Sequence, residues 1–217
     1  MTHSPDKWDT GGSYSFGMDG DDLRPVRLFR TPWTVSRMAA DTCIWIAWRD
    51  PADPEQPAIE ELLRLRREGR VEIAKTDTVD TERTDGVPDA KATDRLLETA
   101  GIIELHGPVV VGHSRWDHAV FASDEDSDRI DGVFAVLFPD SDRNAMDRTS
   151  IHKLRDAMHI ATAIRYGYDV FVTAETRLLK KADAIRREWG IEILCPSNSV
   201  RWVEHRIELE RVRSERH

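Results

Sequence analysis

The chain has 217 residues and a formal net charge of −9, and 40% of its residues are hydrophobic. This length suits one domain with additions, or at most two small domains. No apolar run approaches the roughly 20 residues that a membrane-spanning helix requires. The acidic balance argues against a broad nucleic-acid-binding surface. It leaves room for a nuclease, because bound cations would offset the charge of an acidic metal site.

The chain contains only two cysteines, Cys43 and Cys195, which argues against a disulfide framework and against a cysteine zinc site. The first residues lack the basic and then apolar plan of a secretory signal. We therefore expect a cytoplasmic protein.

Residues 1–35 are rich in Gly, Asp, Ser and Pro and show no sustained periodicity, so we expect a flexible N-terminal arm. Asp41 then precedes a β-branched and aromatic run over 43–48, which predicts a core strand. An amphipathic helix around Leu62 and a second strand over 71–74 follow.

The stretch from 153 to 175 carries the most information in the sequence. Apolar residues at helical spacing, Ala157 and Ile160 among them, predict a helix that Asp156 opens and Gly167 ends. The short run 170–173 predicts a buried strand, with Glu175 just past its carboxyl end. Ligands of open α/β sheets gather at that edge.

A further helix over 178–185, a last strand over 191–194 and a charged helical tail over 204–217 complete the chain. Strands that alternate with helices imply a mainly parallel sheet. The predicted fold is α/β, a three-layer α/β/α domain over 36–203.

The stretch from 153 to 175 resembles the C-terminal half of a PIN domain, a metal-dependent ribonuclease fold. The match covers the order and spacing of nine residues: Asp156, Ala157, His159, Ile160, Ala161, Ala163, Gly167, Asp169 and Thr173. Asp41-Thr42 resembles the start of the same family's first strand. The chain departs from the family at Cys43, where Asn is usual, and at Glu175, where Asp is usual. Compared with a minimal PIN domain, residues 107–148 form an insertion.

The resemblance implies a site of four carboxylates that binds Mg²⁺ or Mn²⁺, formed by Asp41, Glu82, Asp156 and Glu175. Asp80 competes with Glu82 for its place. Thr173 is expected to orient a water or a carboxylate, and three cations flank the acidic positions and could hold RNA phosphates: Arg155, Arg177 and Lys180.

Carboxylates about 4 Å apart repel by roughly 4 kcal/mol at an effective dielectric near 20. Hard divalent cations, which prefer oxygen ligands, would relieve that repulsion. Such a cation also lowers the pKa of a water that can attack a phosphodiester. The expected function is therefore a metal-dependent endoribonuclease.

Two other classes of function remain open on the sequence. Cys43 and Glu175 favour a catalytically inactive PIN-like module that binds RNA or protein. An aspartyl phosphatase would use Asp41 as its nucleophile, although Cys43 stands where a second Asp is typical. An antitoxin-like protein partner and a homodimer are compatible with the resemblance, although the small-toxin members of the family are much shorter.

Overall fold

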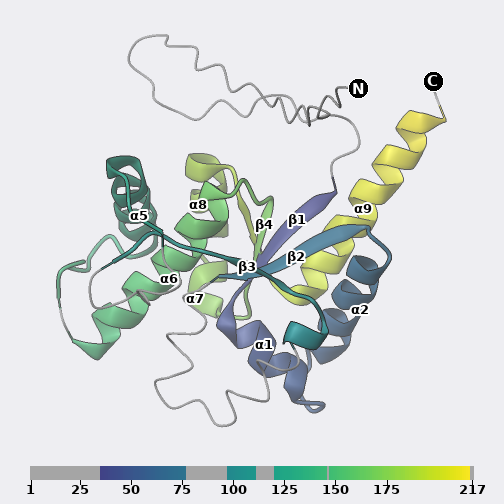
Figure 1. Cartoon of the computed structure of the whole chain (residues 1–217), viewed down its shortest axis with the longest axis horizontal. Coiled ribbons are helices and arrows are strands. Elements are labelled where there is room, and N and C mark those ends of the chain that lie inside the picture. Colours follow the sequence, from purple (N-terminus) through teal and green to yellow (C-terminus); the bar gives the residue numbers. More distant parts are fainter. Residues whose placement is uncertain (1–34, 77–96, 111–119, 146, 216–217) are drawn as a thin grey trace, which may run out of the picture. The chain divides into compact units, whose positions relative to one another are not determined.

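The computed structural model describes residues 35–76, 97–110, 120–145 and 147–215. Five strands form one parallel sheet in this part of the chain (Figure 1). The order of the strands across the sheet is β3-β2-β1-β4-β5, and all four neighbouring pairs are parallel. The strands are β1 (Ser36–Ala40), β2 (Val71–Thr76), β3 (Ile103–Leu105), β4 (Val170–Val172) and β5 (Glu192–Leu194).

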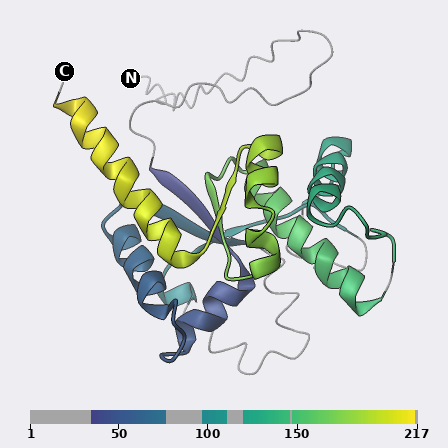
Figure 2. The ribbon, with the colours of Figure 1, turned by 180° about the vertical axis from the view of Figure 1, so that it is seen from behind.

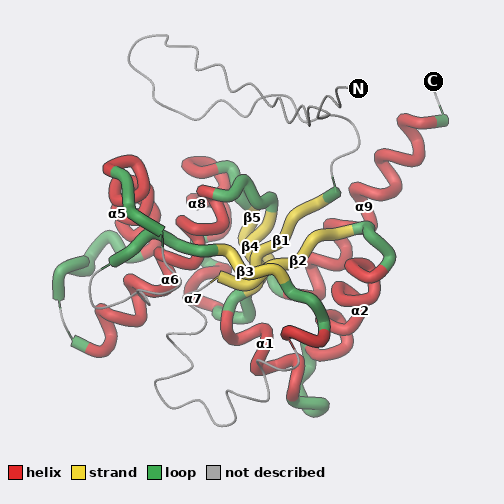
Figure 3. The backbone as a smooth tube through the Cα atoms, viewed as in Figure 1, coloured by secondary structure: helices red, strands yellow, loops and turns green. Residues whose placement is uncertain are grey.

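Helices cover both faces of this sheet and give the three-layer α/β/α architecture that the sequence predicted (Figure 3). On one face lie α1 (Thr42–Arg49), α2 (Gln56–Arg67) and α9 (Pro196–Ser214) (Figure 1). On the other face lie α5 (Asp124–Leu137), α6 (Arg148–Arg165), α7 (Thr176–Leu179) and α8 (Ala182–Trp189), which Figure 2 shows from behind. No helix in the described ranges is long and apolar enough to cross a bilayer.

Side chains alternate between the two faces of the sheet along each strand, so each face has its own hydrophobic core. In β4, Val170 and Val172 pack toward α1, α2 and α9, whereas Phe171 between them packs toward α5, α6 and α8. All three side chains are at most 2% exposed. A strand buried on both faces reads as an unbroken apolar run, which is why the sequence identified β4.

The predicted first strand is wrong, because residues 43–48 lie in helix α1 and the strand is Ser36–Ala40. Asp41 caps the helix with its side chain, which accepts a hydrogen bond from the amide of Thr42. The burial pattern is also helical: Ile44, Trp45 and Ala47 are buried while Ile46 is 43% exposed. Tertiary packing here overrides the β propensity of the Ile and Trp side chains.

The structure adds detail to the insertion and to the charged tail. The insertion carries helix α5, which contacts α6 and is tied to it by an ion pair of 2.8 Å between Arg165 and the buried Asp126. The charged tail is the continuation of α9, which begins at Pro196. The helix predicted over 178–185 is two helices, α7 and α8.

Helices α5 and α8 approach each other closely at Gly132. A Cβ atom at this position would lie 2.5 Å from Cζ2 of the Trp189 ring. Ala is favoured over Gly in a helix by about 1 kcal/mol, but overpacking costs about 1–3 kcal/mol. We therefore expect Gly132→Ala to lower the free energy of unfolding by about 1 kcal/mol, as measured by urea denaturation.

Two controls separate helix propensity from the contact with Trp189. Ala135→Gly, at an exposed position of α5, measures the helix propensity alone. In a Trp189→Leu background, Gly132→Ala should become stabilising, because the ring that it would meet is gone. Destabilisation that is unchanged in that background would show that the close approach does not limit residue 132.

Candidate functional site

The strand order places a topological switch point between β1 and β4. From β1 the chain continues to β2 and β3 on one side, whereas β4 and β5 extend the sheet on the other side. Loops after the carboxyl ends of such strands diverge, and ligands of open α/β sheets bind between them. Asp41 follows β1 and Thr173 follows β4, so both lie at this point.

Asp41 is held at the switch point by several hydrogen bonds. Its backbone amide donates to the carbonyl of Val172 at 2.9 Å, which joins the ends of β1 and β4. Its Oδ1 accepts from the Thr42 amide at 2.7 Å, and its Oδ2 accepts from the Thr173 hydroxyl at 2.6 Å. The side chain is buried, with 4% of the residue exposed, so its orientation is fixed by the protein and not by solvent.

Thr173 uses its hydroxyl within this network. The hydroxyl donates to Asp41 and accepts the amide of Glu175 at 3.1 Å. The predicted orienting role of Thr173 therefore falls on a carboxylate. The same hydroxyl also fixes the direction in which the chain leaves β4 toward Glu175.

Cys43 takes part in the same network from the first turn of α1. Its thiol donates to Asp41 Oδ2 at 3.3 Å, and its sulfur accepts the amide of Ala174 at 3.3 Å. Burial, with the nearby charge of Asp41, raises the pKa of the Cys43 thiol well above its usual range. Cys43 thus stays a neutral thiol that supports Asp41.

Asp156 lies inside α6, which begins at Arg148 with Asp147 as its cap, so the prediction that Asp156 opens the helix is wrong. Only 4% of the residue is exposed. Burial raises the pKa of the Asp156 carboxyl to about 8; the charge of Arg177 opposes this rise, and the charges of Glu175 and Asp41 add to it. Three carboxylates therefore influence one another at this edge.

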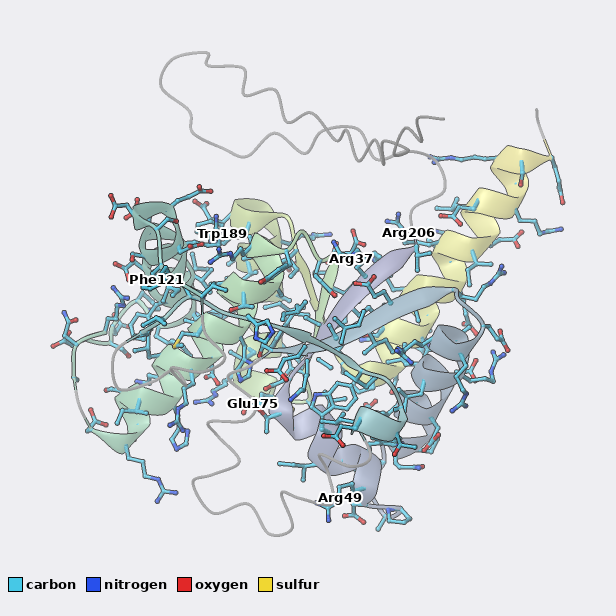
Figure 4. All side chains as sticks on the ribbon, viewed as in Figure 1. Arg37, Arg49, Phe121, Glu175, Trp189 and Arg206 are labelled. Carbon is cyan, nitrogen blue, oxygen red and sulfur yellow. The ribbon has the colours of Figure 1, made fainter. Side chains whose placement is uncertain are left out.

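Glu175 and Arg177 complete the arrangement from the start of α7. Glu175 is the N-cap residue of this helix and lies at the end of the sheet that is remote from Arg37 (Figure 4). Nε of Arg177 is 2.5 Å from Glu175 Oε2, and its Nη2 is 2.9 Å from Asp156 Oδ2. Burial opposes the charge on Arg177, but these carboxylates raise its pKa overall.

The other predicted site residues have mixed positions. Glu82 and Asp80 lie outside the described residues, as do residues 1–34 of the predicted arm. Of the three cations expected to hold RNA, Arg155 is buried and Lys180 is exposed. The third, Arg177, is engaged by two carboxylates, and nothing in the sequence signalled that ion pairing.

His159 lies one turn after Asp156 and is fully buried. Its Nδ1 is hydrogen-bonded to the hydroxyl of Thr76, the last residue of β2, and its ring lies 6.2 Å from that of Phe171. The histidine therefore links α6 to the carboxyl end of β2. This contact keeps the Asp156 segment of α6 close to the sheet edge.

The donors at this edge fit a hard divalent cation in their chemistry. Carboxylate oxygens are the ligands that Mg²⁺ and Mn²⁺ prefer, and the raised pKa of Asp156 reflects a site poor in solvent and rich in negative charge. Within the described residues, no three His, Cys, Asp or Glu side chains are already arranged around a metal position.

Comparison with known proteins gives no family assignment. No protein-family model matches the chain, and no curated protein matches it. Its resemblance to PIN domains therefore rests on the residues quoted above.

Proposed function

We propose that the chain is a PIN-like, metal-dependent endoribonuclease that acts in the cytoplasm. The observation that carries this proposal is that contacts link three acidic residues at the switch point of a parallel sheet. The Thr173 hydroxyl joins Asp41 to the amide of Glu175, and Arg177 bridges the carboxyl groups of Glu175 and Asp156. Burying acidic groups together lowers stability. An arrangement of this kind is therefore typical of a functional site.

In this proposal Asp41, Asp156 and Glu175 hold Mg²⁺ or Mn²⁺, and Glu82 or Asp80 adds a fourth carboxylate. A bound cation would supply an activated water and offset the charge that develops on the phosphate. Thr173 and Cys43 keep Asp41 in one orientation. The exposed Lys180 would contact an RNA phosphate outside the cleaved bond.

The test is cleavage of a mixed pool of end-labelled RNA by the purified chain, with Mg²⁺, with Mn²⁺ and with a chelator. We expect cleavage with either cation and none with the chelator. The new ends should carry no cyclic phosphate, because water and not the neighbouring ribose hydroxyl attacks the phosphorus. Cleavage that survives the chelator, or cyclic phosphate ends, would overturn the proposal.

A second candidate is a binding module of the same fold without catalysis. The observation that favours it is that Arg177, a residue of the chain itself, already occupies an oxygen of both Asp156 and Glu175. In that case the assay would show RNA retained on a filter but left intact with both cations. A protein partner or a second copy of the chain would then be the next ligand to test.

A further inference from the structure

Arg177 makes contact with two of the three described carboxylates of the candidate site. Its guanidinium bridges Asp156 Oδ2 and Glu175 Oε2 through different nitrogen atoms. The Asp156 side chain is 5% exposed, while that of Arg177 is 43% exposed. The guanidinium of Arg177 therefore lies between solvent and the buried carboxyl group of Asp156.

A divalent cation would bind the same two carboxylates. Mg²⁺ takes oxygen ligands at about 2.1 Å and repels a neighbouring guanidinium. The two cations are therefore alternatives at Asp156 and Glu175. The side chain of Arg177 can leave without movement of α7, because the next residue, Leu178, is 1% exposed and anchors the helix in the core.

We propose that Arg177 is an internal counter-cation that competes with the divalent metal. In the metal-free protein Arg177 contacts both Asp156 and Glu175, and metal binding breaks both contacts and turns the guanidinium out to solvent. This inference rests on the proposed metal site. It goes beyond that site by assigning the apparent metal affinity to one residue of the chain.

The expected size of the effect follows from the population of the open form. The apparent dissociation constant equals the intrinsic value divided by the fraction of molecules that can bind. If the contacts of Arg177 with Asp156 and Glu175 are formed in about nine-tenths of the molecules, removing Arg177 tightens metal binding about tenfold.

The experiment is isothermal titration of the metal-free proteins with MnCl₂, in the wild type, Arg177→Gln and Arg186→Gln. Arg186 on α8 is the matched control, because it pairs with Asp183 and Glu192 and loses the same charge. We expect Arg177→Gln to bind Mn²⁺ about tenfold more tightly than the wild type. Arg186→Gln should stay within about twofold of it. Unchanged or weaker binding by Arg177→Gln, with a wild-type circular dichroism spectrum, would overturn the inference.

A second readout follows Arg177 itself in the wild-type protein. The Nε–H resonance of Arg177 should shift and exchange faster with water as Mg²⁺ is added, because its hydrogen bond to Glu175 is broken. A resonance that stays unchanged at saturating Mg²⁺ would overturn the displacement. If metal binds without these effects, the metal site stands and only the role of Arg177 fails. If neither the wild type nor Arg177→Gln takes up metal, the proposed function fails with it.

Discussion

Asp156→Asn is expected to reduce metal-supported RNA cleavage by about a thousandfold or more, the loss typical when one main electrostatic group of an active site is removed. Asn keeps the shape of the side chain but removes the charge that would bind the cation. Asp156 is buried on α6 beside Glu175 and Asp41. Solvent cannot replace its carboxylate at that position. The measurement is the single-turnover cleavage rate with Mg²⁺ and with Mn²⁺.

Asp183→Asn is the matched control for this substitution. Its side chain is 87% exposed on α8, and its ion pair with Arg186, at 3.3 Å, lies open to solvent. The control should cleave RNA at the wild-type rate with both cations. Wild-type cleavage by Asp156→Asn would reject the metal mechanism, and equal loss in both variants would show that net charge and not the site is responsible.

The sequence predicted those helices and strands whose local pattern of apolar residues matches the residues that are buried in the fold. The structure confirms strands β2, β4 and β5 and helices α2 and α6. Each has apolar residues at the regular spacing of its type of element and a glycine in the turn beside it. Gly167 has the positive φ that its position at the end of a helix suggested. Strand β1 was missed because Ser36–Ala40 consists of small and polar residues apart from Met38, and it becomes a strand through its central place in the sheet.

The candidate site was predictable to the extent that it follows from topology. Carboxyl ends of parallel strands meet at one edge, so Thr173 and Glu175 could be assigned to it from their positions at the end of β4 and just past it. Asp41 could not be assigned in this way, because the strand that it follows, β1, was not predicted. The place of Asp156 within α6 and the bridging by Arg177 depend on how helices α6 and α7 pack on the sheet. A linear pattern contains no information on such a contact between helices.

The pKa of Asp156 makes a second prediction, for the stability of the metal-free protein. The folded-state pKa, about 8, lies above the ordinary value of 3.8. Folding therefore favours the protonated carboxyl. Its contribution to stability is complete below about pH 4 and is lost as the pH rises toward 8, by at most about 1.4 kcal/mol for each pH unit.

Asp156→Asn has no proton to lose and should not show this decline. Carboxylates whose pKa is lowered, Asp126 and Glu72 among them, are present in both proteins. Their opposite pH dependence therefore cancels in the comparison. We expect urea denaturation in the presence of a chelator to give similar free energies of unfolding for the two proteins near pH 4. At pH 7 the variant should be more stable by several kcal/mol. The same pH dependence in both proteins between pH 5 and 8 would mean that Asp156 is ionised in the folded state, and that Arg177 fully compensates the burial of its charge.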